Sequence, residues 1–172
     1  KMSRLVRDLS RKSGKEILFV TEGEDTEIDR NMVDVVNEPL VHLLRNAVDH
    51  GIETPEERKK TGKSDIAVIA LNAFSTGGNI VVEVRDDGTG ISREAVEKKA
   101  IEKGLIQPDQ NWTEREILNL IFTPGFSTSE TVTDISGRGV GLDVVKQGLE
   151  QLRGTIDVSS REGEGTLFTL KI

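Results

Sequence analysis

The sequence of 172 residues predicts an α+β fold, a two-layer α/β sandwich in which a mostly antiparallel, mixed sheet carries its helices on one face. Three observations support this prediction. Strand-like segments come in pairs joined by glycine-containing turns, segments with helical signals separate these pairs, and the chain shows no internal repeat.

The N-terminal third is expected to hold two helices and one strand. Residues 2–12 have the pattern of a helix that enters from an upstream domain, and residues 17–19 that of a first strand. Residues 31–50 predict a longer helix, in which Pro39 marks a break or a fresh start. Gly51 is a natural C-terminal stop for this helix.

A hairpin is expected in the middle of the chain. Residues 53–64 are polar and charged, which predicts a loop or a loose helix before it. In the segments 66–73 and 79–85, apolar residues alternate with polar ones, as in half-buried strands. Gly77 and Gly78 between them favour a tight turn, so the two strands should pair antiparallel.

Capping residues define the helices of the second half. Ser92 can cap a helix over 93–103 that Gly104 ends, and Thr113 with Glu116 forms a capping box. The remaining elements are the capped helix up to Phe122, a long segment rich in Ser, Thr and Gly over 123–139 that is typical of a functional lid, a helix over 142–152, and strands over 155–159 and 166–172.

The composition excludes several classes of protein. Acidic residues outnumber basic ones by 30 to 23, a net charge of −7, which argues against a nucleic-acid partner. The chain has no cysteine, so it has no disulfide or thiolate metal site, and this fits the cytosol. No apolar run approaches the ~20 residues that a membrane span needs. We therefore expect a cytoplasmic protein without membrane insertion.

The helix over 31–50 carries the first candidate site. His42, Asn46 and His50 recur at i, i+4 and i+8, so they share one face of a helix. This polar stripe suits an extended ligand such as a triphosphate, and a merely solvated face is an equally good interpretation. The opposite, apolar face should meet the core through Leu40, Leu43, Leu44, Ala47 and Val48.

Two glycine-rich segments are the other candidates. Residues 86–90 (DDGTG) follow a strand, where glycines allow close backbone approach and a carboxylate can accept a hydrogen bond from an exocyclic amine. Taken alone, this segment is more typical of a turn. Residues 137–141 (GRGVG) open a helix, where free backbone N–H groups favour phosphate binding over a simple hinge.

In this order, the three segments resemble the ATP-binding fold shared by DNA gyrase, Hsp90, histidine kinases and MutL, the GHKL superfamily or Bergerat fold. Residues 42–47 (HLLRNA) are similar to its N box, the two glycine-rich segments to its glycine boxes, and residues 165–168 (GTLF) to its closing strand. The resemblance is closer still to the chemotaxis histidine kinases, because 50–53 (HGIE) extends the N box and 55–58 (PEER) follows it.

The resemblance implies an ATP site with Mg²⁺ bound by Asn46, in which Asp86 holds the adenine amino group and Thr166 supports Asp86. His42 stands where hydrolytic relatives carry a water-activating Glu, which suits phosphotransfer, and its role as base or phosphate contact is open. The implied catalytic residues are His42 and Asn46, the implied metal ligand is Asn46, and the implied nucleotide contacts are Asn46, Asp49, His50, Asp86, Gly88, Gly90, Ile91, Ser127, Thr128, Gly137, Arg138, Gly139, Val140, Gly141, Leu142 and Thr166.

The resemblance also implies the reaction and the partners. The domain would transfer the γ-phosphate of ATP to a histidine in the phosphorelay of two-component chemotaxis signalling. Both histidines of the chain lie in the proposed pocket helix, so the acceptor would be on a separate phosphotransfer domain. Residues 1–13 would end an upstream dimerisation segment, 14–172 would form the kinase domain, and a receptor-coupling domain would follow. The isolated domain is expected to be monomeric.

Three alternatives remain open at this point. An ATP hydrolase or clamp of the GHKL type predicts a Glu at the position of His42. A serine kinase of the anti-sigma type would be smaller and would lack the 50–53 motif. A non-catalytic nucleotide sensor would share the binding residues, so only an assay of phosphotransfer separates it from a kinase.

Overall fold

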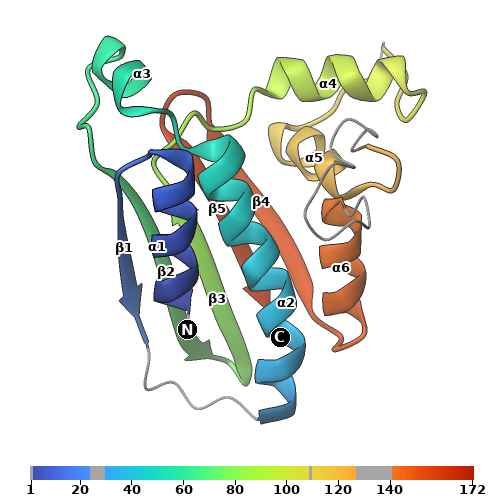
Figure 1. The fold of residues 1–172 in the computed structure, drawn as a ribbon. Helices are drawn as coiled ribbons and strands as arrows, with labels where there is room; N and C mark the ends of the chain where they lie inside the picture. The colour runs from blue at the N-terminus through green and yellow to red at the C-terminus, as the bar shows by residue number, and fades with distance from the viewer. Residues whose placement is uncertain (1, 24–29, 109, 127–140) are drawn as a thin grey trace.

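The computed structural model describes residues 2–23, 30–108, 110–126 and 141–172, and it consists of a sheet with a layer of helices (Figure 1). The five strands have the order β1-β2-β3-β5-β4. β1 is parallel to β2, and the pairs β2–β3, β3–β5 and β4–β5 are antiparallel. This confirms the mixed, mostly antiparallel sheet. The strands are β1 (Ile17–Glu22), β2 (Ala67–Thr76), β3 (Asn79–Asp86), β4 (Thr155–Arg161) and β5 (Gly165–Lys171).

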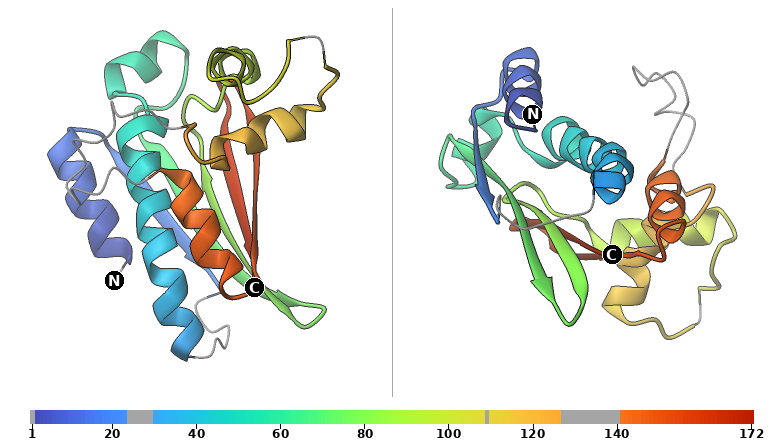
Figure 2. Two further views of the ribbon diagram at one scale, coloured as in Figure 1. Left: turned by 90° about the vertical axis from the view of Figure 1, so that its right-hand side faces the viewer. Right: turned by 90° about the horizontal axis from the view of Figure 1, so that it is seen from below.

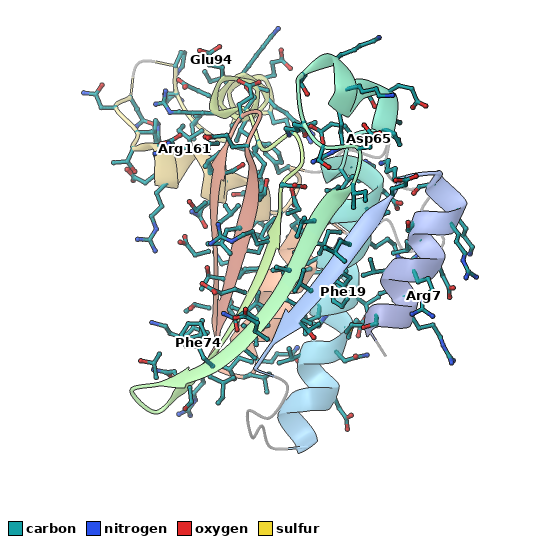
Figure 3. All side chains as sticks on the ribbon, turned by 90° about the vertical axis from the view of Figure 1, so that its left-hand side faces the viewer. Arg7, Phe19, Asp65, Phe74, Glu94 and Arg161 are labelled. Carbon is teal, nitrogen blue, oxygen red and sulfur yellow. The ribbon has the colours of Figure 1, made fainter. Side chains whose placement is uncertain are left out.

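The helices confirm the two-layer prediction. α1 (Met2–Ser13), α2 (Arg30–Asn46) and α6 (Leu142–Glu150) lie on one face of the sheet, as Figures 1 and 2 show. Phe74 stands on the opposite side from α1 and α2 (Figure 3). The shorter helices are α3 (Pro55–Lys60), α4 (Arg93–Glu102), α5 (Glu114–Asn119) and the 3₁₀ turn η2 (Leu120–Phe122).

Helix α2 runs through Pro39 without a break, so the predicted break is wrong. A proline inside a helix removes one hydrogen bond and crowds the preceding turn. Tertiary packing offsets this cost: Pro39 is buried, and its Cγ lies 4.0 Å from where a Cβ of Gly148 on α6 would stand. The predicted core face of α2 is confirmed, because Leu40, Leu43, Leu44, Ala47 and Val48 are all buried.

The end of α2 changes its geometry. Ala47–Gly51 form a π-helical turn, η1, and the N–H of Ile52 donates to the carbonyl of Ala47 at 2.8 Å. Lys15 Nζ donates to the carbonyl of Val48 at 2.6 Å and so satisfies one of the carbonyl groups at this helix end. Single π turns inside helices are frequent at functional sites.

The predicted turn and caps are present. Gly77 and Gly78 have φ of +54° and +82° and connect β2 to β3. Thr54 and Glu57 form a further capping box, so the segment predicted as a loop or loose helix contains the well-capped helix α3. The predicted caps of the later helices are confirmed at Ser92 for α4 and at Thr113 with Glu116 for α5.

One apolar core fills the space between the helices and the sheet. It contains Val6 of α1, Leu44 of α2, Ile69 of β2 and Leu170 of β5, none more than 2% exposed. α1 therefore packs into the same core as the rest of the domain, and the assignment of 1–13 to an upstream segment stays a prediction. None of the described helices has the length and apolar character to cross a membrane.

Candidate functional site

Those candidate residues that the structure describes lie at one end of the sheet. α2 runs toward this end, β3 terminates here at Asp86, and α6 runs away from it (Figure 1). Figure 3 places Asp65, just before β2, and Arg161, the last residue of β4, at this same end of the molecule. The fold therefore brings together segments that are more than a hundred residues apart in the sequence, such as the end of α2 and the end of β4.

Asp86 is a buried acid at this end. Its side chain lies on the helix-covered face of β3, like that of Val84, and the residue is 7% exposed. Burial raises the pKa of Asp86 to about 6, opposed by hydrogen bonds from the backbone N–H groups of Gly88 and Thr166 and reinforced by the charge of Asp87. The Gly88 N–H lies 2.9 Å from Oδ1. A carboxylate held in this way is suited to accept a hydrogen bond from a ligand N–H.

A row of polar side chains crosses three strands beside Asp86. Asp86 is the register partner of Thr166, and Thr166 that of Ser160. The hydroxyls of Thr166 and Ser160 are 3.0 Å apart, and both residues are 8% exposed. Ser160 Oγ donates to the Gly165 carbonyl and accepts from the Ile91 N–H, both at 2.8 Å. Ser160 thus ties the end of the first glycine-rich segment to the β4–β5 turn.

The glycines of the first glycine-rich segment are required by the protein's own backbone. A Cβ at Gly88 would stand 2.0 Å from the carbonyl oxygen of Gly51, and one at Gly90, where φ is +72°, would stand 2.2 Å from that of Arg161. The Thr89 N–H donates to the same Gly51 carbonyl at 2.8 Å. The close backbone contacts thus explain both glycines without any ligand. The prediction that Gly88 and Gly90 also make room for the base of a nucleotide stays a prediction.

We expect Gly88→Ala to lower the free energy of unfolding by about 1–3 kcal/mol, because its methyl group would overlap the Gly51 carbonyl. Urea unfolding monitored by circular dichroism measures the change. Gly148→Ala is the matched control, since its Cβ would meet no atom closer than 4.0 Å and alanine favours a helix. Equal unfolding midpoints for Gly88→Ala and the parent protein would contradict this close approach.

Helix α2 presents His42 and Asn46 one turn apart, both at half-buried positions. Asp49 and His50 are exposed and lie in the π turn η1. His42 and Asn46 therefore share one face of α2, as their spacing predicts. His50 follows Asn46 through the π turn, and its place on the same polar face stays a prediction.

Most of the second glycine-rich segment lies outside the described residues. This applies to the predicted lid beyond residue 126 and to six of the predicted nucleotide contacts. Gly141 is the N-cap of α6, with φ −91°, and Leu142 is its first residue. Because the first N–H groups of a helix have no partner within it, the start of α6 has donors suited to an anion. The six contacts outside the described residues are Ser127, Thr128, Gly137, Arg138, Gly139 and Val140.

The helix-covered mixed sheet, with its buried acid beside a glycine-lined turn, is the architecture of an ATP-binding domain. Comparison with protein families agrees: the family described as "Histidine kinase-, DNA gyrase B-, and HSP90-like ATPase" matches residues 35–172. The chain belongs to this family. The match begins within α2 and includes every strand except β1.

Within this family, the chain is similar to chemotaxis proteins along its whole length. It is 49% identical to the chemotaxis protein CheA of Rhizobium meliloti over 172 residues, which is 100% of this chain and 23% of that protein. It is 47% identical to the sensor histidine kinase CheAY of Helicobacter pylori over 174 residues, 100% of this chain and 22% of that protein. The chain thus spans between a fifth and a quarter of these relatives, and the likeness to chemotaxis histidine kinases inferred from the sequence is confirmed.

Solved structures support the fold. The histidine kinase domain of the Erythrobacter litoralis EL346 blue-light activated histidine kinase matches with a TM-score of 0.55 at 17% identity, covering 99% of this chain and 61% of that one. The three-dimensional likeness therefore extends over the described elements although most side chains differ.

For two residues of the site, the sequence has no local signal that indicates their partners. Ser160 is a small polar residue that continues the buried alternation of Ile156 and Val158, and only strand pairing brings it to Thr166. Arg58 is 2% exposed although it lies in a short, highly charged helix. The alternation indicates that Ser160 is buried, and no pattern indicates the partners of Arg58.

Proposed function

We propose that the chain binds Mg-ATP and transfers the γ-phosphate to a histidine on a separate phosphotransfer domain, as the catalytic part of a bacterial chemotaxis histidine kinase. The observation that carries this proposal is Asp86, a buried carboxylate with a raised pKa at the end of β3 in a chain of the ATPase family. The near 50% identity to proteins named CheA and CheAY supports the kinase assignment.

In this proposal Asp86 accepts a hydrogen bond from the adenine amino group, while backbone N–H groups of Gly88 and Thr166 hold its carboxylate in place. Asn46 offers its amide oxygen to Mg²⁺, an ion that is commonly held by one or two protein oxygens together with waters and phosphate oxygens. When bound, the ion neutralises charge on the transferring phosphate. The remaining proposed contacts are Asp49, His50, Gly90, Ile91, Gly141 and Leu142 among the described residues, with the second glycine-rich segment around the phosphates.

His42 favours transfer over hydrolysis. It stands one turn before Asn46, where a carboxylate would be needed to activate water. An imidazole has a reference pKa of about 6.5, so it can contact a phosphate or accept a proton near neutral pH. His42 and His50 are the only histidines of the chain, and both belong to the proposed site. The acceptor histidine is therefore proposed to lie on another domain.

The proposed setting is a larger cytoplasmic kinase. The named relatives are more than four times as long as this chain, which leaves ample length for dimerisation, phosphotransfer and receptor-coupling domains. In such a kinase this domain would contact the other domains of the same protein. The isolated domain is proposed to be a monomer. The expected partners are protein domains, with no nucleic acid and no membrane insertion.

Labelled ATP should label a separate phosphotransfer domain when this chain is added, because an acceptor held in line near the γ-phosphate supplies the missing nucleophile. The product should be acid-labile and base-stable, as expected of phosphohistidine. His42→Gln should slow transfer more than it weakens ATP binding, and an acceptor domain lacking its histidine is the control. Phosphate release as fast as transfer would indicate a hydrolase, and ATP binding without any transfer would indicate a nucleotide sensor.

A further inference from the structure

Four charged side chains form a cluster beside the site, here named the Arg58 cluster: Glu53, Arg58, Lys63 and Asp87. Arg58 Nη1 lies 2.9 Å from Glu53 Oε1, and Arg58 Nη2 lies 3.1 Å from Asp87 Oδ2. Lys63 Nζ lies 2.7 Å from Glu53 Oε2. The Arg58 and Glu53 side chains are only 2% and 8% exposed, while those of Lys63 and Asp87 are 19% and 42% exposed. The network has two charges of each sign, is buried at its centre and reaches solvent at Asp87.

The cluster holds the backbone that directly follows Asp86. Lys63 Nζ donates to the carbonyl of Asp87 at 3.0 Å and to that of Gly88 at 2.7 Å. Arg58 Nη1 donates to the Asp87 carbonyl at 3.3 Å. The Asp87 side chain is fixed in turn, because its Oδ1 accepts from the Val68 N–H at 2.9 Å.

Gly51, a few residues before Glu53, contacts the 87–89 turn from another side. Gly51, which ends η1, accepts the Thr89 N–H through its carbonyl at 2.8 Å. A Cβ on Gly51 would stand 3.3 Å from Asp86 Oδ2, so the end of the Asn46-bearing helix lies against the carboxylate itself. Residues 51–63 therefore hold both sides of the turn that carries Asp86.

The acidic residues of the Arg58 cluster also affect the pKa of Asp86. Burial acts to raise the pKa of Glu53, but the hydrogen bond from Lys63, a backbone hydrogen bond and the charges of Lys63 and Arg58 together lower it. Asp87 and Glu53 are two of the charges that raise the pKa of Asp86. Removing Lys63 would leave the buried carboxylate of Glu53 with Arg58 as its remaining cationic partner, which is unfavourable.

We propose that Arg58 and Lys63 are positioning residues for nucleotide recognition, which hold the 87–88 backbone so that the Asp86 carboxylate meets the adenine amino group. This inference rests on the proposed function, and in particular on Asp86 as the group that recognises adenine. The hydrogen bonds of Arg58 and Lys63 to backbone carbonyls at 87–88 hold the turn rather than the start of α6, so losing them should affect recognition of the base more than that of the phosphates.

The test compares the affinities for ATP and GTP by calorimetry. Lys63→Met should lower the ratio of the two affinities about tenfold, while GTP binding, which depends on the phosphates, changes little. Lys63→Arg should retain the ratio, because it keeps a cation within reach of the same carbonyl groups. Lys59→Met, at an exposed lysine of α3, the helix that carries Arg58, is the matched control and should leave both affinities unchanged. Lys63→Gln repeats the test with a more polar side chain should the Met variant fail to fold.

Asp86→Asn, measured in parallel, separates the inference from the function on which it rests. If Asp86→Asn keeps the preference for ATP, the adenine assignment is wrong and the positioning role is overturned with it. If Asp86→Asn loses the preference while Lys63→Met and Lys63→Gln keep it, only the positioning role is overturned. An equal loss of ATP and GTP affinity in the Lys63 variants would mean a purely structural role and would also overturn it.

Discussion

Asp86→Asn should remove the preference of the domain for ATP over GTP. In the parent protein Oδ1 accepts the Gly88 N–H at 2.9 Å, so an asparagine would keep its oxygen there and place its NH₂ group where Oδ2 now stands. A donor at that position opposes the adenine amino group and suits the guanine carbonyl. Sites that hydrogen-bond a substrate N–H reject analogues lacking it by up to roughly 10⁴-fold. Calorimetry should therefore show a loss of selectivity of about 100-fold or more, and unchanged selectivity would contradict the assignment.

The same substitution should stabilise the folded protein at neutral pH. The pKa of Asp86 is about 6 in the fold against 3.8 for an ordinary aspartate, so the folded state binds the proton more tightly. The stability associated with the protonated carboxyl is present below about pH 4 and is lost as the pH rises through 6. The ionised, buried carboxylate then costs up to about 3 kcal/mol, which an uncharged asparagine avoids.

Urea unfolding at two pH values tests this stability change. Asp86→Asn should be more stable than the parent protein at pH 7.5, and the difference should shrink toward pH 4. Asp65→Asn, at an exposed aspartate of the same end of the molecule, is the control and should show no such gain. Equal stabilities of Asp86→Asn and the parent at pH 7.5 would mean that Asp86 is better solvated than its burial indicates.

Asn46→Ala should abolish phosphotransfer while leaving the fold intact. The substitution removes the amide oxygen proposed to hold Mg²⁺, and a metal that polarises a phosphoryl oxygen contributes several kcal/mol, which corresponds to about 10³-fold in rate. Alanine is a better helix former than asparagine and Asn46 is only half-buried, so stability should change by less than about 1 kcal/mol. Asn46→Asp is also expected to lose transfer, because it adds a negative charge beside the triphosphate.

The measurement is the rate of labelling of a phosphotransfer domain at saturating ATP over a range of Mg²⁺ concentrations. Asn37→Ala is the matched control, since Asn37 is another half-buried asparagine of α2. It should transfer phosphate at the parental rate. A parental rate for Asn46→Ala at low Mg²⁺ would show that the metal is held by other groups.

Several elements could be predicted because their signals act within a few residues. Ser92 and the Thr113–Glu116 box begin helices through hydrogen bonds to the next turn, and Gly77-Gly78 connects two strands directly. Leu43 and Leu44 face the core because the helical period alone places them there. The order of the N box and the glycine-rich segments was likewise sufficient to indicate the ATPase family.

The sequence by itself therefore determined the α+β class, most of the described helix and strand positions, and the segments that are proposed to form the site. Only the tertiary structure decided that α2 passes through Pro39, since the packing of Gly148 against the proline ring comes from a helix a hundred residues away. The tertiary structure also decided the pKa of Asp86, because it is the burial of this side chain that raises the pKa above that of an ordinary aspartate. Arg58 meets Asp87 across 29 residues of chain, and contacts over such separations depend on how the strands pair, which no local pattern encodes.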